Sequence, residues 1–194
     1  MQSDPQQLVS LSMSEFLQRL ASEMPTPGGG AAAGVSGALA AALGCMVCAL
    51  TAGRPKFAAV EPRVRELHTS LDRSRRMLEE LIDEDAAAYG ELSAAFKLPK
   101  NDASRGDRVR AAAEVAASVP LQTVAIARAV MDSLCDLREI GNPNLRSDVE
   151  AGIHMAHAAM HAAAENVRAN LPFVTTDAAT RLGNELDQLL ASSA

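Results

Sequence analysis

An acidic triplet in the stretch "DEDAAAYGELSAAF" is the first candidate for catalysis. Asp83, Glu84 and Asp85 lie within a pattern of leucines that predicts a long helix. Such a helix cannot point three successive side chains to water when its neighbours pack closely, so one of the three is expected to face inward. A fully solvated acidic face is the alternative. Burial disfavours a charged carboxylate and raises its pKa, which suits general acid–base catalysis.

Three consecutive glycines offer a second kind of chemistry. Gly28, Gly29 and Gly30 follow Pro-Thr-Pro and open a run without a charged residue that extends to Gly53. The first turn of a helix that begins here carries no side chains, so its free N–H groups could meet an anion or a carbonyl at close range. The alternative is a tight turn that requires positive φ angles. A phosphate-binding P-loop is excluded, because no lysine follows the glycines.

Two polar motifs in the second half of the chain could bind a ligand. "GNPNLRSD" combines Asn142 in a turn with Ser147 and Asp148 at the expected start of a helix. These side chains could hold polar groups of a ligand, or they could only cap the helix. "NVRAN" places Asn166 and Asn170 on one helix face, and buried amides are usually there to form hydrogen bonds.

The cysteines and histidines raise redox and metal chemistry. Cys45 and Cys48 have the spacing of a redox motif, but they lie deep in an apolar helix, so we interpret them as core thiols. His154, His157 and His161 form one stripe of a helix. A metal site would need further ligands from elsewhere in the chain or from a partner subunit, so a partly exposed or pocket-facing stripe is favoured and no metal is expected.

Composition decides the fold class and excludes several functions. The 194 residues are 48% hydrophobic but only 3% aromatic, and a core of Ala, Leu, Val and Met favours helix packing over β-sandwiches. We therefore predict an all-α protein. The net charge of −6 and the scarcity of aromatic residues argue against a nucleic-acid partner. An odd number of cysteines, with no sign of a secretory signal, predicts a cytoplasmic location.

Hydrophobic periodicity and helix-ending residues predict a single domain over residues 1–194, with a flexible N-terminus at residues 1–12. The expected fold is a bundle of five to six helices. They cover residues 13–23, the glycines to about residue 51, and residues 61–97, 108–138, 147–171 and 176–192.

The charge-free helix is long enough to span a membrane. It contains only three leucines, two valines and one methionine, however, so we interpret it as the central helix of the bundle, buried all round. Gly30, Gly34, Ala38 and Ala42 recur every fourth residue. Small residues at this spacing let two helix backbones approach closely, either inside the bundle or across a dimer axis.

These stretches together resemble one family. "PTPGGG…AALGCMV…LT.GR..F", "DEDA.A…A..KLPKN", "VPL", "GN....SD" and "NV..NL", in this order, are similar to the cyclodeaminase domain of formiminotransferase-cyclodeaminase and to the related stand-alone methenyltetrahydrofolate cyclohydrolases. The resemblance extends from about residue 15 to residue 190. It implies an all-helical subunit that dimerises and holds a tetrahydrofolate site without a metal. Ala31 departs from the pattern, because many relatives carry serine there.

The resemblance also implies roles for the candidate residues. Both family reactions pass through a tetrahedral carbon and need a proton shuttle, for which we expect Asp85, tuned by Lys56 or Lys97. Asp148 and the three histidines named above are the alternative carriers. The expected substrate-binding residues are Gly28, Gly29, Gly30, Lys97, Lys100, Asn142, Ser147, Asn166 and Asn170. Lys97 and Lys100, with Arg105 and Arg108, would meet the glutamate tail of the folate.

A solitary domain of this size resembles the stand-alone enzymes most, so we expect hydrolysis of 5,10-methenyltetrahydrofolate to 10-formyltetrahydrofolate. The alternatives are a 5-formiminotetrahydrofolate cyclodeaminase and a non-catalytic folate-binding module. No cofactor is expected beyond tetrahydrofolate as substrate, and the expected assembly is a homodimer without a membrane partner.

Overall fold

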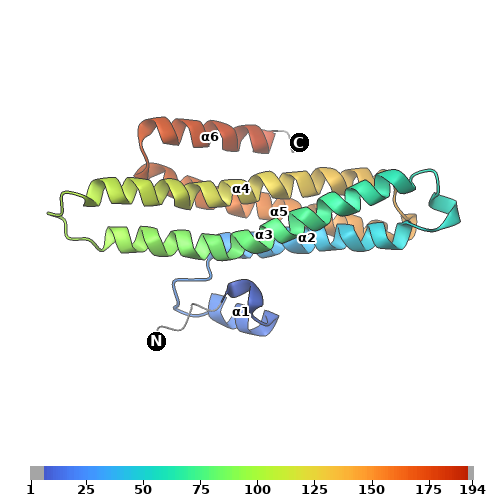
Figure 1. Cartoon of the computed structure of the whole chain (residues 1–194), viewed down its shortest axis with the longest axis horizontal. Helices are drawn as coiled ribbons and strands as arrows, with labels where there is room; N and C mark the ends of the chain where they lie inside the picture. The colour runs from blue at the N-terminus through green and yellow to red at the C-terminus, as the bar shows by residue number, and fades with distance from the viewer. Residues whose placement is uncertain (1–6, 192–194) are drawn as a thin grey trace.

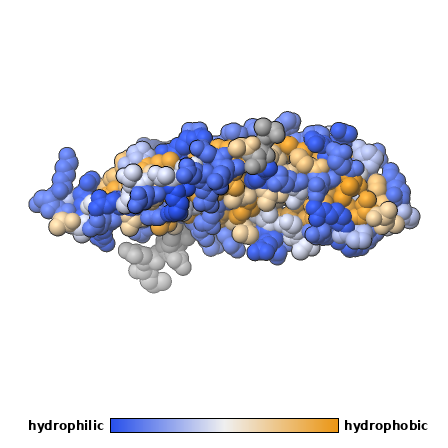
Figure 2. Space-filling view, turned by 90° about the horizontal axis from the view of Figure 1, so that it is seen from above, coloured by the Kyte–Doolittle hydropathy of each residue, from blue (hydrophilic) through white to orange (hydrophobic). Residues whose placement is uncertain are grey.

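Four long antiparallel helices form the body of the molecule, as the computed structural model of residues 7–191 shows (Figure 1). They are α2 (Gly29–Thr51), α3 (Glu61–Phe96), α4 (Arg105–Ile140) and α5 (Arg146–Asn170). No strand occurs within the described residues, so the all-α prediction is confirmed. Figure 2 shows the same elongated shape from above, with hydrophobic patches between hydrophilic residues.

The helices begin and end close to where the helix-starting and helix-ending residues of the sequence predict. Pro62 stands in the first turn of α3, and the glycines open α2. The short helix α1 (Met13–Leu20) ends three residues earlier than expected. Its N-terminus is held by a capping box, in which the Ser12 hydroxyl accepts from the Glu15 N–H and the Glu15 carboxylate accepts from the Ser12 N–H. The last helix is α6 (Thr176–Ala191).

The α2 helix packs against α3, α4 and α5 through its glycines. A Cβ added at Gly44 would lie 2.8 Å from Leu71 Cδ1, and one added at Gly34 would lie 2.8 Å from Ile82 Cγ1. The small residues therefore let the helices approach closely within the bundle, as the sequence indicates.

One prediction about α2 is wrong. The helix is not buried all round, because three large apolar side chains on one face are 37–42% exposed: Leu39, Met46 and Leu50. The three neighbouring long helices leave this fourth side uncovered, and the N-terminal segment covers only part of it. By length and composition α2 is also the helix in the described residues that could cross a membrane, yet here it lies inside a bundle.

Residues 7–12 are ordered, which corrects that part of the expected flexible stretch at residues 1–12. A 3₁₀ turn (Leu8–Ser10) and α1 pack on α2 and α3, where Leu8 and Phe16 form a small buried cluster with Ala31 and Ile82. The Leu8 N–H also donates to the Asp83 carboxylate. Residues 1–6 of that stretch lie outside the described residues.

The far end of the α3–α4 hairpin extends beyond the start of α2. A 3₁₀ turn (Leu171–Phe173) after α5 covers this end, where the rings of Phe96 and Phe173 meet edge to face with centroids 5.1 Å apart. The α6 helix lies over α4, burying Leu182 and Leu186 (Figure 1). The segments of α3 and α4 that precede and follow this end line the candidate site through Asp85, Tyr89, Leu92 and Ala116.

Candidate functional site

A cavity of about 160 Å³ lies where α2 begins. It brings together six of the residues predicted from sequence, from three separate parts of the chain: Gly28, Gly29, Gly30, Asp85, Asn166 and Asn170. We call this the α2 cavity. The remaining lining residues are Pro25, Thr26, Tyr89, Leu92 and Ala116.

Asp85 faces inward, as the sequence predicts for one residue of the acidic triplet. Its carboxylate lies against the first turn of α2 and accepts a hydrogen bond from the Ala31 N–H. Burial raises the pKa of Asp85, and this effect outweighs the Ala31 hydrogen bond, which lowers it. The Asp85 carboxyl group therefore holds its proton more readily than an exposed aspartate, as a group that exchanges protons with a ligand must.

The glycines of α2 are needed for close approach, not for unusual backbone angles. A Cβ at Gly30 would lie 2.1 Å from Asp85 Oδ1, so only glycine leaves room for the carboxylate. Among the described residues, the positive-φ glycine is Gly53, at the other end of α2. The tight-turn alternative is therefore wrong for residues 28–30. The first turn of α2 instead forms one wall of the cavity.

Two amide side chains of α5 form the wall that adjoins the glycines. Asn170 Nδ2 donates to the carbonyl oxygens of Ala116 and Asn166, at 3.0 and 2.9 Å, and Asn166 Nδ2 donates to Ala162 at 2.9 Å. Because these bonds engage the amide nitrogens, the amide oxygens are the groups with capacity to accept from a ligand. The wall therefore suits a ligand that presents N–H donors.

Among the lining residues that the sequence analysis missed, Tyr89 is the one with an aromatic side chain. It lies one helical turn after Asp85 on α3, and its side chain is 47% exposed at the cavity. The spacing of four residues from Asp85 is the signal that could have identified it, because such residues share a helix face. Its ring gives the cavity an aromatic surface beside the carboxylate.

A second group of predicted residues lies at the other end of the bundle. Asn142 is buried, and its N–H donates to Thr51 Oγ1 at the end of α2. Ser147 and Asp148 occupy the first turn of α5, where no side chain caps the helix, so the capping alternative is wrong. The 23 residues of α2 span about 34 Å at 1.5 Å per residue, which separates this group from the α2 cavity.

The two lysines expected to tune Asp85 are not near it within one subunit. Lys56 follows α2, and its Nζ lies 4.8 Å from the centre of the Phe57 ring. Lys97 ends α3, twelve residues after Asp85, which corresponds to about 18 Å along the helix. Lys100 lies further out, in the turn before α4. Lys97 and Lys100 therefore both lie near the turn that joins α3 and α4, beyond the cavity.

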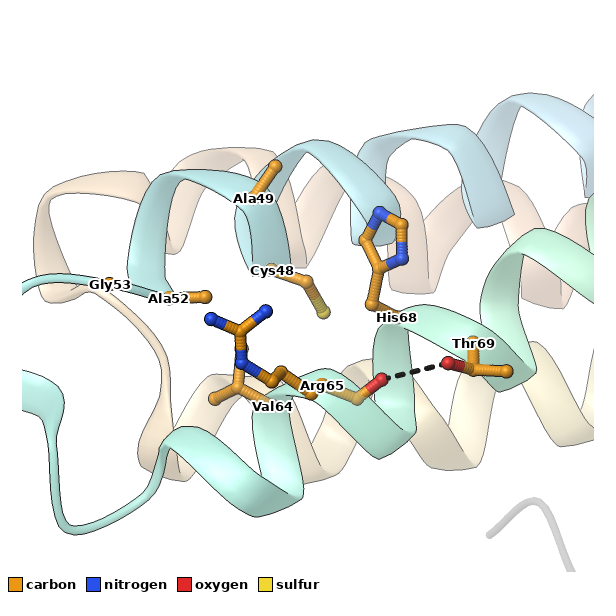
Figure 3. Close-up of a pocket in the computed structure, with 8 residues that line it drawn as sticks. All are labelled: Cys48, Ala49, Ala52, Gly53, Val64, Arg65, His68 and Thr69. Atoms are coloured by element: carbon orange, nitrogen blue, oxygen red, sulfur yellow. Dashed lines mark hydrogen bonds between the residues drawn. The ribbon is translucent and has the colours of Figure 1, made fainter.

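An open pocket of about 550 Å³ lies at the other end of the bundle from the α2 cavity, between the end of α2 and the start of α3 (Figure 3). Arg65 and His68 reach from α3 toward α2, and the Cys48 thiol points between the two helices. Arg65 donates to the Glu61 carboxylate, and its backbone carbonyl accepts from Thr69 at 3.1 Å. We call this the distal pocket.

The cysteines and histidines take no part in the α2 cavity. Cys48 is buried, and burial raises its pKa to about 12, which supports its interpretation as a core thiol. The histidine stripe of α5 is exposed, with the His157 and His161 rings 4.3 Å apart. Within residues 7–191, no group of three His, Cys, Asp or Glu side chains is placed to hold a metal ion.

Comparison with known proteins places this geometry in one family. Residues 12–187 match the family model described as formiminotransferase-cyclodeaminase. The chain is 38% identical over 183 residues to a methenyltetrahydrofolate cyclohydrolase of Methylorubrum extorquens, covering 92% of this chain and 88% of that protein. It is 31% identical over 180 residues to the formimidoyltransferase-cyclodeaminase of Rattus norvegicus, of which it spans 33%. The crystal structure of formiminotetrahydrofolate cyclodeaminase from Thermotoga maritima superposes with a TM-score of 0.88 at 30% identity, covering 95% of this chain and 90% of that one.

Proposed function

Because the chain belongs to the formiminotransferase-cyclodeaminase family, we propose that it acts on a one-carbon unit bound to tetrahydrofolate and hydrolyses 5,10-methenyltetrahydrofolate to 10-formyltetrahydrofolate. The observation that carries this proposal is the inward Asp85 carboxyl group, held against the glycines of α2 in a cavity whose other wall offers amide oxygens. A non-catalytic folate-binding module has no need for a buried acid with a raised pKa.

The proposed reaction needs one group that can take up and return a proton. Water adds to the cationic methenyl carbon between N5 and N10, and the Asp85 carboxylate accepts one of its protons. The resulting tetrahedral carbon carries two nitrogens and a hydroxyl group. Asp85 then donates its proton to N5 as the bond from carbon to N5 breaks, which leaves the formyl group on N10. The second proton of the water is released to solvent.

The rest of the cavity orients the substrate for these steps. The amide oxygens of Asn166 and Asn170 accept from N–H groups of the pterin ring, and the free N–H groups of the first turn of α2 face carbonyl or anionic groups. Lys97 and Lys100, on the hairpin end, lie where the negatively charged glutamate tail leaves the cavity.

A cyclodeaminase reaction is the second candidate, and the close superposition on the Thermotoga maritima cyclodeaminase supports it. There N10 of 5-formiminotetrahydrofolate attacks the formimino carbon, and ammonia leaves from the tetrahedral intermediate once its nitrogen is protonated. The same Asp85 carboxyl group serves both reactions, because each needs a proton moved at that carbon.

The two reactions change the methenyl absorbance in opposite directions. Purified protein is mixed with 5,10-methenyltetrahydrofolate and, separately, with 5-formiminotetrahydrofolate, and the absorbance is followed. A fall with the first substrate supports the cyclohydrolase, and a rise with the second supports the cyclodeaminase. If neither changes although folate binds, the chain is a folate-binding module and the enzymatic proposal is wrong.

The proposal extends to the setting in which the protein acts. We infer a single domain over residues 1–194 that works in the cytoplasm without a cofactor beyond its folate substrate, and without a nucleic-acid or membrane partner. The net charge of −6 and the low aromatic content support the absence of a nucleic-acid partner. The uncovered apolar face of α2 supports a homodimer, because such a face is stabilised when a second copy covers it.

A further inference from the structure

A buried proline interrupts the hydrogen bonds of α4. Pro120 stands well inside this helix, which continues through it from Arg105 to Ile140. In a regular helix the N–H of residue 120 would donate to the carbonyl oxygen of Ala116, four residues earlier. Proline has no N–H, and its ring also pushes that carbonyl away from the helix axis. The Ala116 oxygen is therefore available to a donor outside α4.

The side chain of Asn170 on α5 supplies that donor. Its Nδ2 lies 3.0 Å from the Ala116 oxygen, although the two residues are 54 positions apart in the sequence. The same Nδ2 donates to the carbonyl oxygen of Asn166 in its own helix, at 2.9 Å. An amide nitrogen carries two N–H groups, so both are used, one on each helix. The Asn170 nitrogen is thereby fixed between α4 and α5.

This contact sets which end of the amide group faces a ligand. The last torsion of an asparagine side chain has two nearly equivalent settings, which exchange the positions of its nitrogen and oxygen. The Ala116 oxygen is an acceptor, so it selects the setting that turns Nδ2 toward α4 and leaves Oδ1 to accept from other groups. Ala116 and Asn170 both line the α2 cavity, together with Asp85. The orientation of the amide is therefore a property of the candidate site.

We propose that Pro120 is a positioning residue of the α2 cavity. By freeing the Ala116 carbonyl, it fixes the Asn170 amide with its oxygen available to N–H groups of the substrate. Pro120 is not among the residues that line the cavity, so it acts through Asn170 and touches no substrate. The proposal rests on the proposed function, because it concerns the same site. It implies that the site selects ligands that present an N–H donor at this position over ligands that present a carbonyl.

Asn166, one helical turn before Asn170, provides an internal comparison. Its Nδ2 donates to the Ala162 carbonyl within α5, at 2.9 Å. This bond stays inside one helix, so the orientation of the Asn166 amide does not depend on α4. A change at residue 120 should therefore affect the Asn170 amide and leave the Asn166 amide as it is.

The substitution Pro120→Ala tests the positioning role through enzyme kinetics. It restores the N–H of residue 120, so the regular helical bond draws the Ala116 carbonyl back toward the axis of α4 and away from Asn170. KM should then rise by about 2- to 12-fold, the range that corresponds to the net contribution of one hydrogen bond. The value of kcat should stay near that of the wild type, because Asp85 is untouched. Alanine favours helices, so the variant should fold, and circular dichroism checks this.

A double-mutant cycle distinguishes positioning from a general effect on packing. If Pro120 acts through Asn170, the double variant Pro120→Ala/Asn170→Ala should have the same KM as Asn170→Ala. Independent effects that multiply would overturn the proposal, as would an unchanged KM in Pro120→Ala. The matched control is Pro62→Ala, in the first turn of α3, where proline removes no intrahelical bond. Its KM and kcat should equal those of the wild type.

Nuclear magnetic resonance tests the same contact without activity. The side-chain amide protons of Asn170 are assigned in ¹⁵N-labelled protein by their loss in Asn170→Ala. In Pro120→Ala they should exchange with solvent about 2- to 12-fold faster than in the wild type, whereas those of Asn166 should not change. Equal exchange for Asn170 in both proteins would overturn the positioning role. If exchange changes as expected but the wild type does not turn over folates, the proposed function is wrong and the link between Pro120 and Asn170 stands.

Discussion

The position of Asp85 is a balance between two opposing effects on one carboxyl group. The Ala31 N–H stabilises the carboxylate, but burial against the first turn of α2 stabilises the protonated form more, so the pKa is raised. Because Gly30 has no side chain, the carboxyl group reaches the helix start without displacing it. A carboxyl group held in this way can act as a base and then as an acid within one reaction.

Replacing this carboxyl group should affect chemistry more than binding. Asp85→Asn keeps the size of the side chain and an oxygen for the Ala31 N–H, so KM should change little while kcat falls by about 10²- to 10⁴-fold. Because the pKa is raised, the wild-type rate should fall as the pH drops through a value above that of an ordinary aspartate. Steady-state kinetics across pH check both expectations. An unchanged kcat would remove Asp85 from the mechanism and make Asp148 the first alternative.

Tyr89 allows substrate binding to be followed directly. The chain has one tyrosine and no tryptophan, so intrinsic emission comes from the mouth of the α2 cavity alone. If the pterin ring stacks on it, Tyr89→Ala should raise KM by about 5- to 150-fold, which corresponds to the 1–3 kcal/mol of aromatic stacking on a base. Tyr89→Phe should keep a KM near that of the wild type.

The emission itself gives a second measurement for the same residue. Titration with tetrahydrofolate should quench the tyrosine emission of the wild type, and the quenching gives a dissociation constant. Calorimetry on Tyr89→Phe, which has no tyrosine emission, should give the same dissociation constant. A wild-type emission that stays constant while calorimetry detects binding would place the ligand away from Tyr89.

At the scale of the elements, the helices could be predicted well because their ends are marked in the sequence. Pro62 begins α3, the glycines begin α2, and Ser12 with Glu15 begins α1. The spacing of Asn166 and Asn170 also predicted correctly that the two amides share one wall. The error in placing Lys56 beside Asp85 came from the family resemblance, although the length of the expected helix already implied a separation of about 34 Å.

Two glycines in helices should respond to the same substitution in opposite ways. Gly44→Ala places a methyl group 2.8 Å from Leu71 Cδ1 and 3.1 Å from Leu134 Cδ2 in the core, so it should destabilise the fold by about 1–3 kcal/mol. Gly90→Ala meets nothing within 4 Å and should stabilise α3 by about 0.5–1 kcal/mol. Urea unfolding of both variants measures the difference. Equal effects would mean that α2 does not pack as tightly as the structure shows.

At the scale of the whole molecule, the burial of α2 could not be predicted from sequence alone. A helix without charges indicates that all its faces avoid water, but the sequence does not say whether the same chain or a second copy covers each face. Gly44 faces the bundle, whereas Met46, two residues later, faces outward. In the proposed homodimer, a second copy of the chain would cover this face.

A charged substitution on the uncovered face of α2 can test dimerisation without disturbing the fold of the subunit. Met46 is 37% exposed in the single chain, so Met46→Glu should leave the helical content and the fold of the subunit intact. In the proposed dimer the new carboxylate is buried without a partner, which should shift the protein from dimer to monomer in sedimentation at micromolar concentration. Val115→Glu is the matched control, since Val115 is 55% exposed on α4 and should leave the dimer unchanged. A Met46→Glu variant that stays dimeric would contradict the proposed homodimer.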